Sequence, residues 1–315
     1  MNYRGATAGG FRRLARAIVA CAVLCVGICV LAGCTSYPSV EDALKDADLQ
    51  PTVSSGATLE PGVLTVGVNA SNAPYAWPVT VGQTTVLDGI DVDVAVAMAE
   101  RMGLTVKFVD VASDYEAAAK GLCDVVMGAS TMTLPGSEVL VGNYLETAPS
   151  IFAKNATSIV TVEQLGTSTV GVQSDSLSAR TVAAMAPTAV LSPFGTLNDA
   201  FSALEAGSVQ YVACDSFMGG YLATGFSDIA FAGALSLPET RGVAVAASNV
   251  ELQNAVTDAV DQVTSSGELQ AIREVWVGSM PVIGVNNLIT PPAAPEPAPE
   301  APAEGEVPVE GAPVE

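Results

Sequence analysis

Apolar and polar positions follow two alternating patterns across residues 62–278. Short β-branched runs predict strands that are buried on both faces, and longer stretches with apolar residues three or four apart predict helices. The runs that predict strands are 63–68, 106–109, 123–129, 168–172, 189–191, 210–214 and 243–245. The stretches that predict helices are 90–102, 114–120, the segment after Ser176, 197–206, 250–263 and 269–275. This order predicts an α/β architecture with parallel sheets, and its repetition predicts two similar lobes.

The first 33 residues have the pattern of a secretory signal peptide. Four arginines precede an uncharged apolar run from Ala17 to Gly33, which ends in small residues. This run is at the short limit for a membrane-spanning helix, although an uncleaved N-terminal helix stays an alternative. The segment Leu31-Ala32-Gly33-Cys34 resembles the lipobox of bacterial lipoproteins. That resemblance implies cleavage before Cys34, lipidation of its thiol with palmitate, and an extracytoplasmic protein anchored to the cell membrane.

Two segments flanking the core differ from it in composition. Residues 34–60 are predicted to be a tether between the anchor and the core. Residues 280–315 are predicted to be a disordered acidic tail, because 291–315 contains eight prolines, six glutamates and no basic residue. Such a segment buries too little apolar surface to offset the entropy lost on ordering.

Charge and residue usage exclude several classes of function. Without the signal segment the chain has eight basic and 33 acidic residues, a formal charge of −25, which disfavours binding to nucleic acid. The chain contains no histidine, so Ser-His-Asp catalysis and the usual zinc sites are excluded. We therefore expect no enzyme activity, cofactor or metal. Cys123 and Cys214 lie in strand-like segments, which favours two buried thiols over a disulfide.

Several short motifs in the core closely resemble those of the bacterial extracellular solute-binding proteins of family 3, the polar amino-acid type. The resemblance covers about residues 61–279, and no single motif in it is specific. The matching segments are 62–68, Ala73-Pro74-Tyr75, Gly89-Ile90-Asp91-Val92-Asp93, 121–125, Thr131-Met132-Thr133, 203–207, Cys214-Asp215-Ser216, and Gly267-Glu268-Leu269 with Ile272, Trp276 and Gly278.

This resemblance implies a two-lobed type II periplasmic-binding-protein fold with two hinge crossovers. Lobe one would comprise residues 61–147 and 243–279, and lobe two residues 148–242 including the hinges, which fall near 146–150 and 239–242. The implied function is that of the solute-binding component of an ABC importer. A monomer would close over a small polar solute and deliver it to the membrane permease.

The resemblance also implies a ligand site, and the sequence departs from the family pattern within it. The arginine that usually clamps the ligand carboxylate is replaced by Gly136, a glycine near the same carboxylate by Asp175, and a stacking aromatic residue by Asn72. The acid that receives the ligand amino group is retained as Asp215. The other candidate ligand-binding residues are Tyr75, Trp77, Ser130, Thr131, Thr133 and Ser176.

These changes make the expected pocket more negative by about two charges. A ligand carboxylate close to Asp175 would be repelled by several kcal/mol at the effective dielectric of a cleft. We therefore expect a cationic or amine-bearing solute rather than an ordinary zwitterionic amino acid, although Arg241 is an alternative source of positive charge.

Each candidate also has a structural interpretation. Asp215 and Asp175 are typical helix caps, Tyr75 and Trp77 are suited to packing at a rim, and Asp91 and Asp93 fit the start of a helix. Two other functions stay open: a ligand-sensing or surface lipoprotein with a degenerate pocket, and a dehydratase-like enzyme that uses carboxylates on the same fold.

Overall fold

The computed structural model of the protein describes residues 49–112 and 114–290. The predicted signal segment, Cys34, the first part of the tether and the Pro-rich segment after residue 290 lie outside the described residues. In the part of the chain that is described, no helix combines the length and the apolar character needed to cross a membrane.

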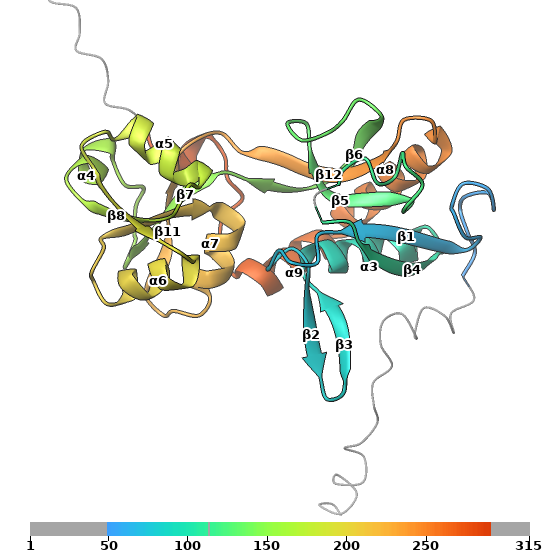
Figure 1. The fold of residues 1–315 in the computed structure, drawn as a ribbon, viewed down its shortest axis with the longest axis horizontal. Helices are drawn as coiled ribbons and strands as arrows, with labels where there is room; N and C mark the ends of the chain where they lie inside the picture. Colours follow the sequence, from blue (N-terminus) through green and yellow to red (C-terminus); the bar gives the residue numbers. More distant parts are fainter. Residues whose placement is uncertain (1–48, 113, 291–315) are drawn as a thin grey trace, which may run out of the picture.

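Two five-stranded sheets form the centres of two lobes (Figure 1). The first sheet has the order β4-β1-β5-β12-β6 and the second has the order β11-β7-β10-β8-β9. The strands of the first sheet are β1 Val63–Val68, β4 Thr105–Asp110, β5 Val125–Ser130, β6 Glu138–Thr147 and β12 Glu239–Ala246. Those of the second sheet are β7 Pro149–Lys154, β8 Thr169–Gln173, β9 Val190–Phe194, β10 Tyr211–Asp215 and β11 Ile229–Ala234.

Both sheets are mixed, which corrects the expectation of purely parallel sheets. β1 runs parallel to β4 and β5, and β8 runs parallel to β9 and β10. β12 is antiparallel to β5 and β6, and β7 is antiparallel to β10 and β11. The antiparallel strands are the ones that carry the chain between the lobes, so their direction follows from the crossovers rather than from a βαβ unit.

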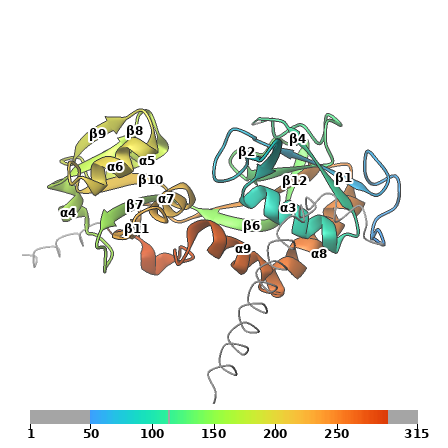
Figure 2. The same ribbon diagram turned by 90° about the horizontal axis from the view of Figure 1, so that it is seen from below.

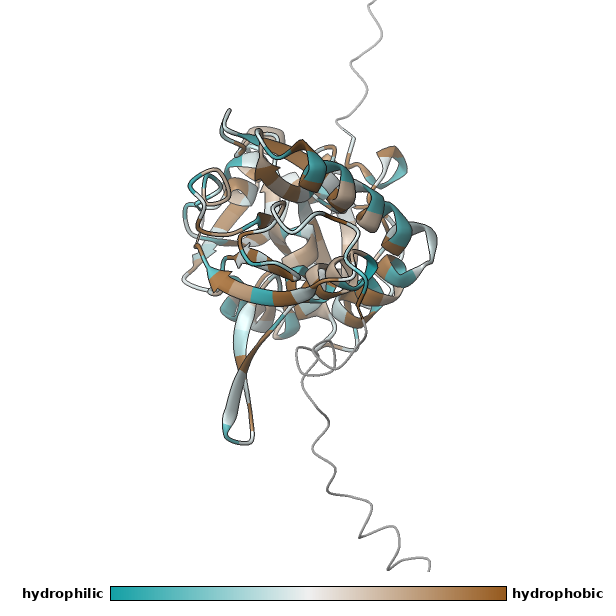
Figure 3. Ribbon diagram, turned by 90° about the vertical axis from the view of Figure 1, so that its right-hand side faces the viewer, coloured by the Kyte–Doolittle hydropathy of each residue, from teal (hydrophilic) through white to brown (hydrophobic). Residues whose placement is uncertain are grey.

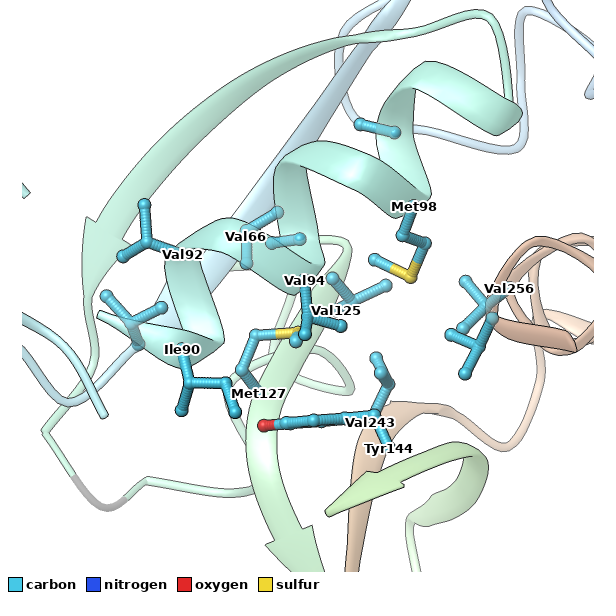
Figure 4. Close-up of a cluster of buried hydrophobic side chains, with 14 of the residues drawn as sticks. Val66, Ile90, Val92, Val94, Met98, Val125, Met127, Tyr144, Val243 and Val256 are labelled. Atoms are coloured by element: carbon cyan, nitrogen blue, oxygen red, sulfur yellow. The ribbon is translucent and has the colours of Figure 1, made fainter. Parts of the chain in front are cut away.

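The core of lobe one is formed by β-branched and methionine side chains on one face of its sheet. The helices on this face are α3 Ile90–Arg101, α8 Val250–Ser265 and α9 Glu268–Val277. Figure 4 shows Val66, Val125 and Val243 from three strands packed against Val94 and Met98 of α3. A smaller cluster around Cys123 and Val126 covers the opposite face.

Lobe two has helices on both faces of its sheet. The helices are α4 Val162–Gly166, α5 Leu177–Met185, α6 Leu197–Glu205 and α7 Ser216–Ala223. One apolar cluster joins Val182 of α5 to the sheet, and the other joins Phe201 of α6 to Phe152 of β7. The alternation of strands and helices along the sequence predicted α5 and α6, but not α4 or α7.

Several elements differ from the pattern-based expectations, and strands β6, β7 and β11 were not predicted. Residues 114–120 form turns instead of a helix. A hairpin of β2 Trp77–Val81 and β3 Thr84–Asp88 was not predicted, and Figure 3 shows it projecting from the rest of the molecule. Six of its ten strand positions are exposed, so its sequence has little of the apolar periodicity that indicates a strand.

Parts of both flanking segments are folded, which corrects the expected start of the tail at residue 280 and end of the tether at residue 60. Ile283 and Ile289 are buried, and the N–H of Ile289 donates to the carbonyl of Ala234 in lobe two. The short helix η1 Val285–Asn287 lies between them. At the other end, Ala57 is buried, and Ser54 bonds to the carboxylate of Glu251 in α8.

The chain passes between the lobes at the β6–β7 and β11–β12 connections (Figure 2). The first connection is the single residue Ala148, and the second runs from Leu235 to the start of β12. Both Ala148 and Leu235 are buried. The second crossover therefore begins a few residues before the hinge that was expected at 239–242.

Cys123 and Cys214 are both free and buried, as the strand-like surroundings predicted. Cys123 lies two residues before β5 of lobe one, and Cys214 belongs to β10 of lobe two. Burial raises the pKa of the Cys123 thiol to about 12 and raises that of Cys214 well above its ordinary value. Both side chains therefore act as small apolar groups rather than as nucleophiles.

Candidate functional site

One hydrogen bond joins two of the predicted site residues across the lobes. Tyr75 lies in the loop after β1, where its side chain is 4% exposed. Its hydroxyl donates to Oδ1 of Asp215, at the end of β10 in lobe two, over 2.9 Å. Burial, followed by the charge of Asp215, raises the pKa of Tyr75 well above its ordinary value, so the phenol stays protonated.

The same Asp215 carboxylate caps helix α7. Its Oδ1 accepts the backbone N–H groups of Phe217 and Met218 at 3.0 and 3.1 Å. The predicted cap is therefore confirmed, and it coexists with the contact to Tyr75. The Tyr75 ring also packs on Phe217, with centroids 5.4 Å apart. A carboxylate held this way has a fixed orientation at the junction of the lobes.

Arg241 of β12 lies beside this pair. Its guanidinium carbon is 5.4 Å from the centre of the Tyr75 ring, in a cation–π arrangement. Its other contacts are long hydrogen bonds, from Nη1 to the carbonyl of Gly128 at 3.4 Å and from Nε to Oγ1 of Thr147 at 3.5 Å. Within residues 49–112 and 114–290, no carboxylate forms an ion pair with Arg241. Burial lowers the pKa of Arg241, but Tyr75 and Asp215 raise it above its ordinary value.

A second buried carboxylate, Asp91, lies under the same region. It belongs to the first turn of α3, is 4% exposed and accepts a 2.6 Å hydrogen bond from the hydroxyl of Tyr144 in β6. Burial raises the pKa of Asp91 to about 7, although the Tyr144 hydrogen bond and the charge of Arg241 oppose this shift. Gly128 leaves room for this carboxylate, because a Cβ there would lie 3.2 Å from Oδ2 of Asp91. The expectation was that Asp91 only supports the start of α3, but its carboxylate also bonds to Tyr144 of β6.

Trp77 contributes to packing where the lobes meet. Its ring lies 5.2 Å from that of Trp276 in α9 and 5.9 Å from that of Tyr221 in α7, centroid to centroid. The indole N–H of Trp276 donates to Asp93 of α3 over 2.8 Å. This aromatic cluster connects α7 of lobe two to both α3 and α9 of lobe one.

The predicted hydroxyl residues form a turn after β5. Ser130 is 2% exposed, and its N–H and hydroxyl both lie 3.2 Å from Oγ1 of Thr133. Thr131, Thr133 and Gly136 are exposed. Ser130 also lies opposite Arg241 in the β5–β12 ladder, so this turn is beside the cation.

Asp175 and Ser176 lie in the turn between β8 and α5 of lobe two. Asp175 is exposed with a φ of +58°, and its backbone carbonyl accepts a 2.8 Å bond from Nη1 of Arg180. Ser176 caps α5 by accepting the N–H of Ala179. Asn72 forms a backbone bridge with Ala76 in the loop that holds Tyr75. The carbonyl of Asn72 accepts the backbone N–H of Tyr75 over 2.7 Å. In the described part of the chain, Asp175 and Ser176 have no direct hydrogen bond to Tyr75 or Asp215.

Sequence reasoning gave little weight to Arg241 and missed Tyr144. The scarcity of positive charge was a usable signal, because only seven of the 12 basic residues lie in the described ranges. Four of these seven form ion pairs with Glu or Asp, and Arg180 bonds to a carbonyl. Among the described residues, Arg180, Arg241 and Arg273 have no ion-pair partner, and Arg180 is the exposed one of the three.

The arrangement provides charged and hydroxyl groups that bind polar molecules. No group of three side chains suited to holding a metal ion occurs in the described ranges. Asp215, Arg241 and the Ser130–Thr133 turn come from both lobes and from the crossover strand β12. Such an arrangement can recognise opposite charges on one small solute.

The model of the bacterial extracellular solute-binding proteins, family 3, matches residues 64–279. The chain belongs to this family. The resemblance noted from the motifs is therefore confirmed, and the protein is an extracellular solute-binding protein. No curated protein gives a significant match.

Solved structures of family members share its fold. An ancestral cationic amino acid solute-binding protein has a TM-score of 0.60 and 24% identity, covering 69% of this chain and 96% of its own. The L-cystine solute receptor of Neisseria gonorrhoeae, in an unliganded open conformation, has a TM-score of 0.60 and 19% identity, covering 73% and 95%. The predicted two-lobed type II periplasmic-binding-protein fold is thereby confirmed.

Proposed function

We propose that this family member is the membrane-anchored, extracytoplasmic receptor of an ABC importer. It binds a small polar, amine-bearing solute between its lobes and delivers the closed form to the permease. Cys34 is the proposed lipid anchor, and the protein acts as a monomer without cofactor or catalysis.

The position of Asp215 is the observation that carries this proposal. Its carboxylate stands at the junction of the lobes, fixed by two backbone N–H groups of α7. A ligand ammonium group that reached this carboxylate from the cleft would form a charge-assisted hydrogen bond. Oδ1 of this carboxylate also accepts a hydrogen bond from Tyr75 of lobe one. Solute binding and the contact between the lobes would therefore involve the same carboxylate.

The charges around the cleft support an amine-bearing solute. Gly136 supplies no cation at the position where the family pattern has its carboxylate clamp, and Asp175 adds a negative group in lobe two. Arg241 is the available cation, but it lies under the Tyr75 ring on the crossover strand. We therefore expect lysine, ornithine, arginine or a diamine to bind more tightly than a neutral or acidic amino acid.

A thermal-shift screen with amino acids, amines, polyamines and short peptides tests the proposal. A solute at 100 times its dissociation constant adds about 2.7 kcal/mol to the free energy of unfolding. The variant Asp215→Asn keeps a cap acceptor but removes the charge, so the shift should shrink strongly while the unliganded melting temperature changes little. Asp258→Asn, on the exposed side of α8, is the matched control and should retain the full shift.

Micromolar binding of a neutral or acidic amino acid would preserve the receptor function but contradict the proposed solute class. One observation favours a second candidate, a surface lipoprotein with a degenerate pocket. Tyr75 already donates to Oδ1 of Asp215, the carboxylate that would receive the ligand amine. Failure of every member of the panel to shift the melting temperature would support that candidate.

A further inference from the structure

A cavity of about 310 Å³ lies beside the crossover strands, between them and helix α9. Its walls come from residues 143–146 of β6, Thr240 of β12, Leu269 and Arg273 of α9, and Val282 of the segment after α9. Figure 2 shows α9 beside β6 at this place. Tyr144, which bonds to Asp91, lines this cavity, whereas Tyr75, Asp215 and Arg241 do not.

Arg273 is the unusual feature of this cavity. Its side chain belongs to the buried set at 9% exposure, yet within the described ranges it has no hydrogen bond and no ion pair. Its guanidinium nitrogens are not fully enclosed by protein, so they face open space. That space is the cavity and the adjoining hollow, both of which Arg273 lines.

The groups around Arg273 offset little of its positive charge. Burial lowers the pKa of Arg273, while Glu146 raises it. Glu146 is exposed and forms no ion pair with Arg273, so water screens it. A guanidinium that is partly withdrawn from water is stabilised by an anion that pairs with it. Leu269, Leu145 and Val282 make much of the remaining wall apolar.

We propose that this cavity binds a small monocarboxylate with a short apolar tail. The carboxylate would pair with Arg273 in a two-pronged hydrogen bond, and the tail would cover the apolar wall. The site is separate from the solute cleft and does not depend on the proposed solute class.

Titration of the full-length protein with hexanoate, followed by calorimetry, tests this site. Hexanoate should bind more tightly than hexanol, which lacks the charge, and than hexylamine, which carries the opposite charge. Arg273→Gln should weaken hexanoate binding about tenfold or more, because a hydrogen-bonded charge pair is removed. Arg180→Gln, a substitution of an exposed arginine in lobe two, is the matched control and should leave hexanoate binding unchanged.

A second variant keeps the test decisive if Arg273→Gln fails to fold. Glu146→Gln removes the acidic side chain that lines the cavity, so hexanoate affinity should rise and Arg273 should remain in place. The proposal is overturned if hexanoate does not bind, if hexylamine binds as well as hexanoate, or if neither substitution changes hexanoate affinity.

Discussion

The Asp215 carboxylate caps helix α7 and bonds to Tyr75 of the other lobe. It is also the proposed acceptor for the ligand amine. Two backbone N–H groups and the Tyr75 hydroxyl already donate to one of its oxygens. Asp91 differs, since a single hydroxyl donates to a carboxylate that is buried. Burial raises the pKa of Asp91 to about 7, and the Tyr144 hydrogen bond opposes this shift only in part.

The raised pKa of Asp91 makes stability depend on pH. The folded state holds this proton up to about pH 7, whereas the unfolded chain releases it near its ordinary value of 3.8. The free energy of unfolding should therefore fall as pH rises from about 4 to about 7, by up to about 4 kcal/mol from this group. Urea denaturation at pH 5.0 and pH 7.5 measures this change.

Asp91→Asn isolates the contribution of this one carboxyl, because the amide keeps an acceptor for Tyr144 and does not titrate. The variant should lose less stability than the wild-type protein between the two pH values. Asp258→Asn, at an exposed position, should behave as wild type. Equal losses in the wild-type protein and Asp91→Asn would contradict the assignment.

At the scale of elements, α7 is the helix that connects the lobes. It starts at the Asp215 cap and packs against β7 of its own lobe and α9 of the other. Gly219 and Gly220 allow α7 to pack this closely against β7 and α9. A Cβ on Gly219 would overlap the Phe152 ring and lie 2.6 Å from Sγ of Cys214. A Cβ on Gly220 would overlap the sulfur of Met280.

Gly219→Ala should therefore destabilise the protein although alanine favours helix. The helix propensity gains about 1 kcal/mol, but overpacking costs about 1–3 kcal/mol, so we expect a net loss of about 1 kcal/mol. Gly195→Ala is the matched control, because nothing lies within 4 Å of a Cβ there. Chemical denaturation that shows equal stability for the two variants would contradict this packing.

The sequence predicted most helices and buried strands, because their periodicity is a local property. It failed at residues 114–120, where three alanines predicted a helix. Ala117 and Ala118 are buried against the sheet, and the carboxylate of Glu138 accepts the N–H of Ala119. A segment this short has little helical stability of its own, so these contacts determine its turns.

The candidate site was less predictable than the fold. The motif resemblance placed Asp215 and Tyr75, but it could not show that they bond to each other. Arg241 and Tyr144 depend on the pairing of β12 with β5 and β6, which are distant in sequence. Arg241 lies opposite Leu145, the neighbour of Tyr144, in the antiparallel β6–β12 ladder, and no local pattern encodes that pairing.

At the scale of the molecule, two sheets are joined by the β6–β7 and β11–β12 connections, and the chain after α9 returns to lobe two at Ile289. Connections this short allow rotation of the lobes about a narrow axis. A solute that contacts both lobes favours the closed state by its differential affinity for that state.

Small-angle X-ray scattering, with and without the solute that gives the largest thermal shift, tests solute capture by lobe closure most directly. We predict that the radius of gyration of the wild-type protein decreases at saturating solute. Asp215→Asn should show no decrease at the same concentration. An unchanged scattering curve for wild-type protein with bound solute would contradict closure of the lobes as the mechanism of capture.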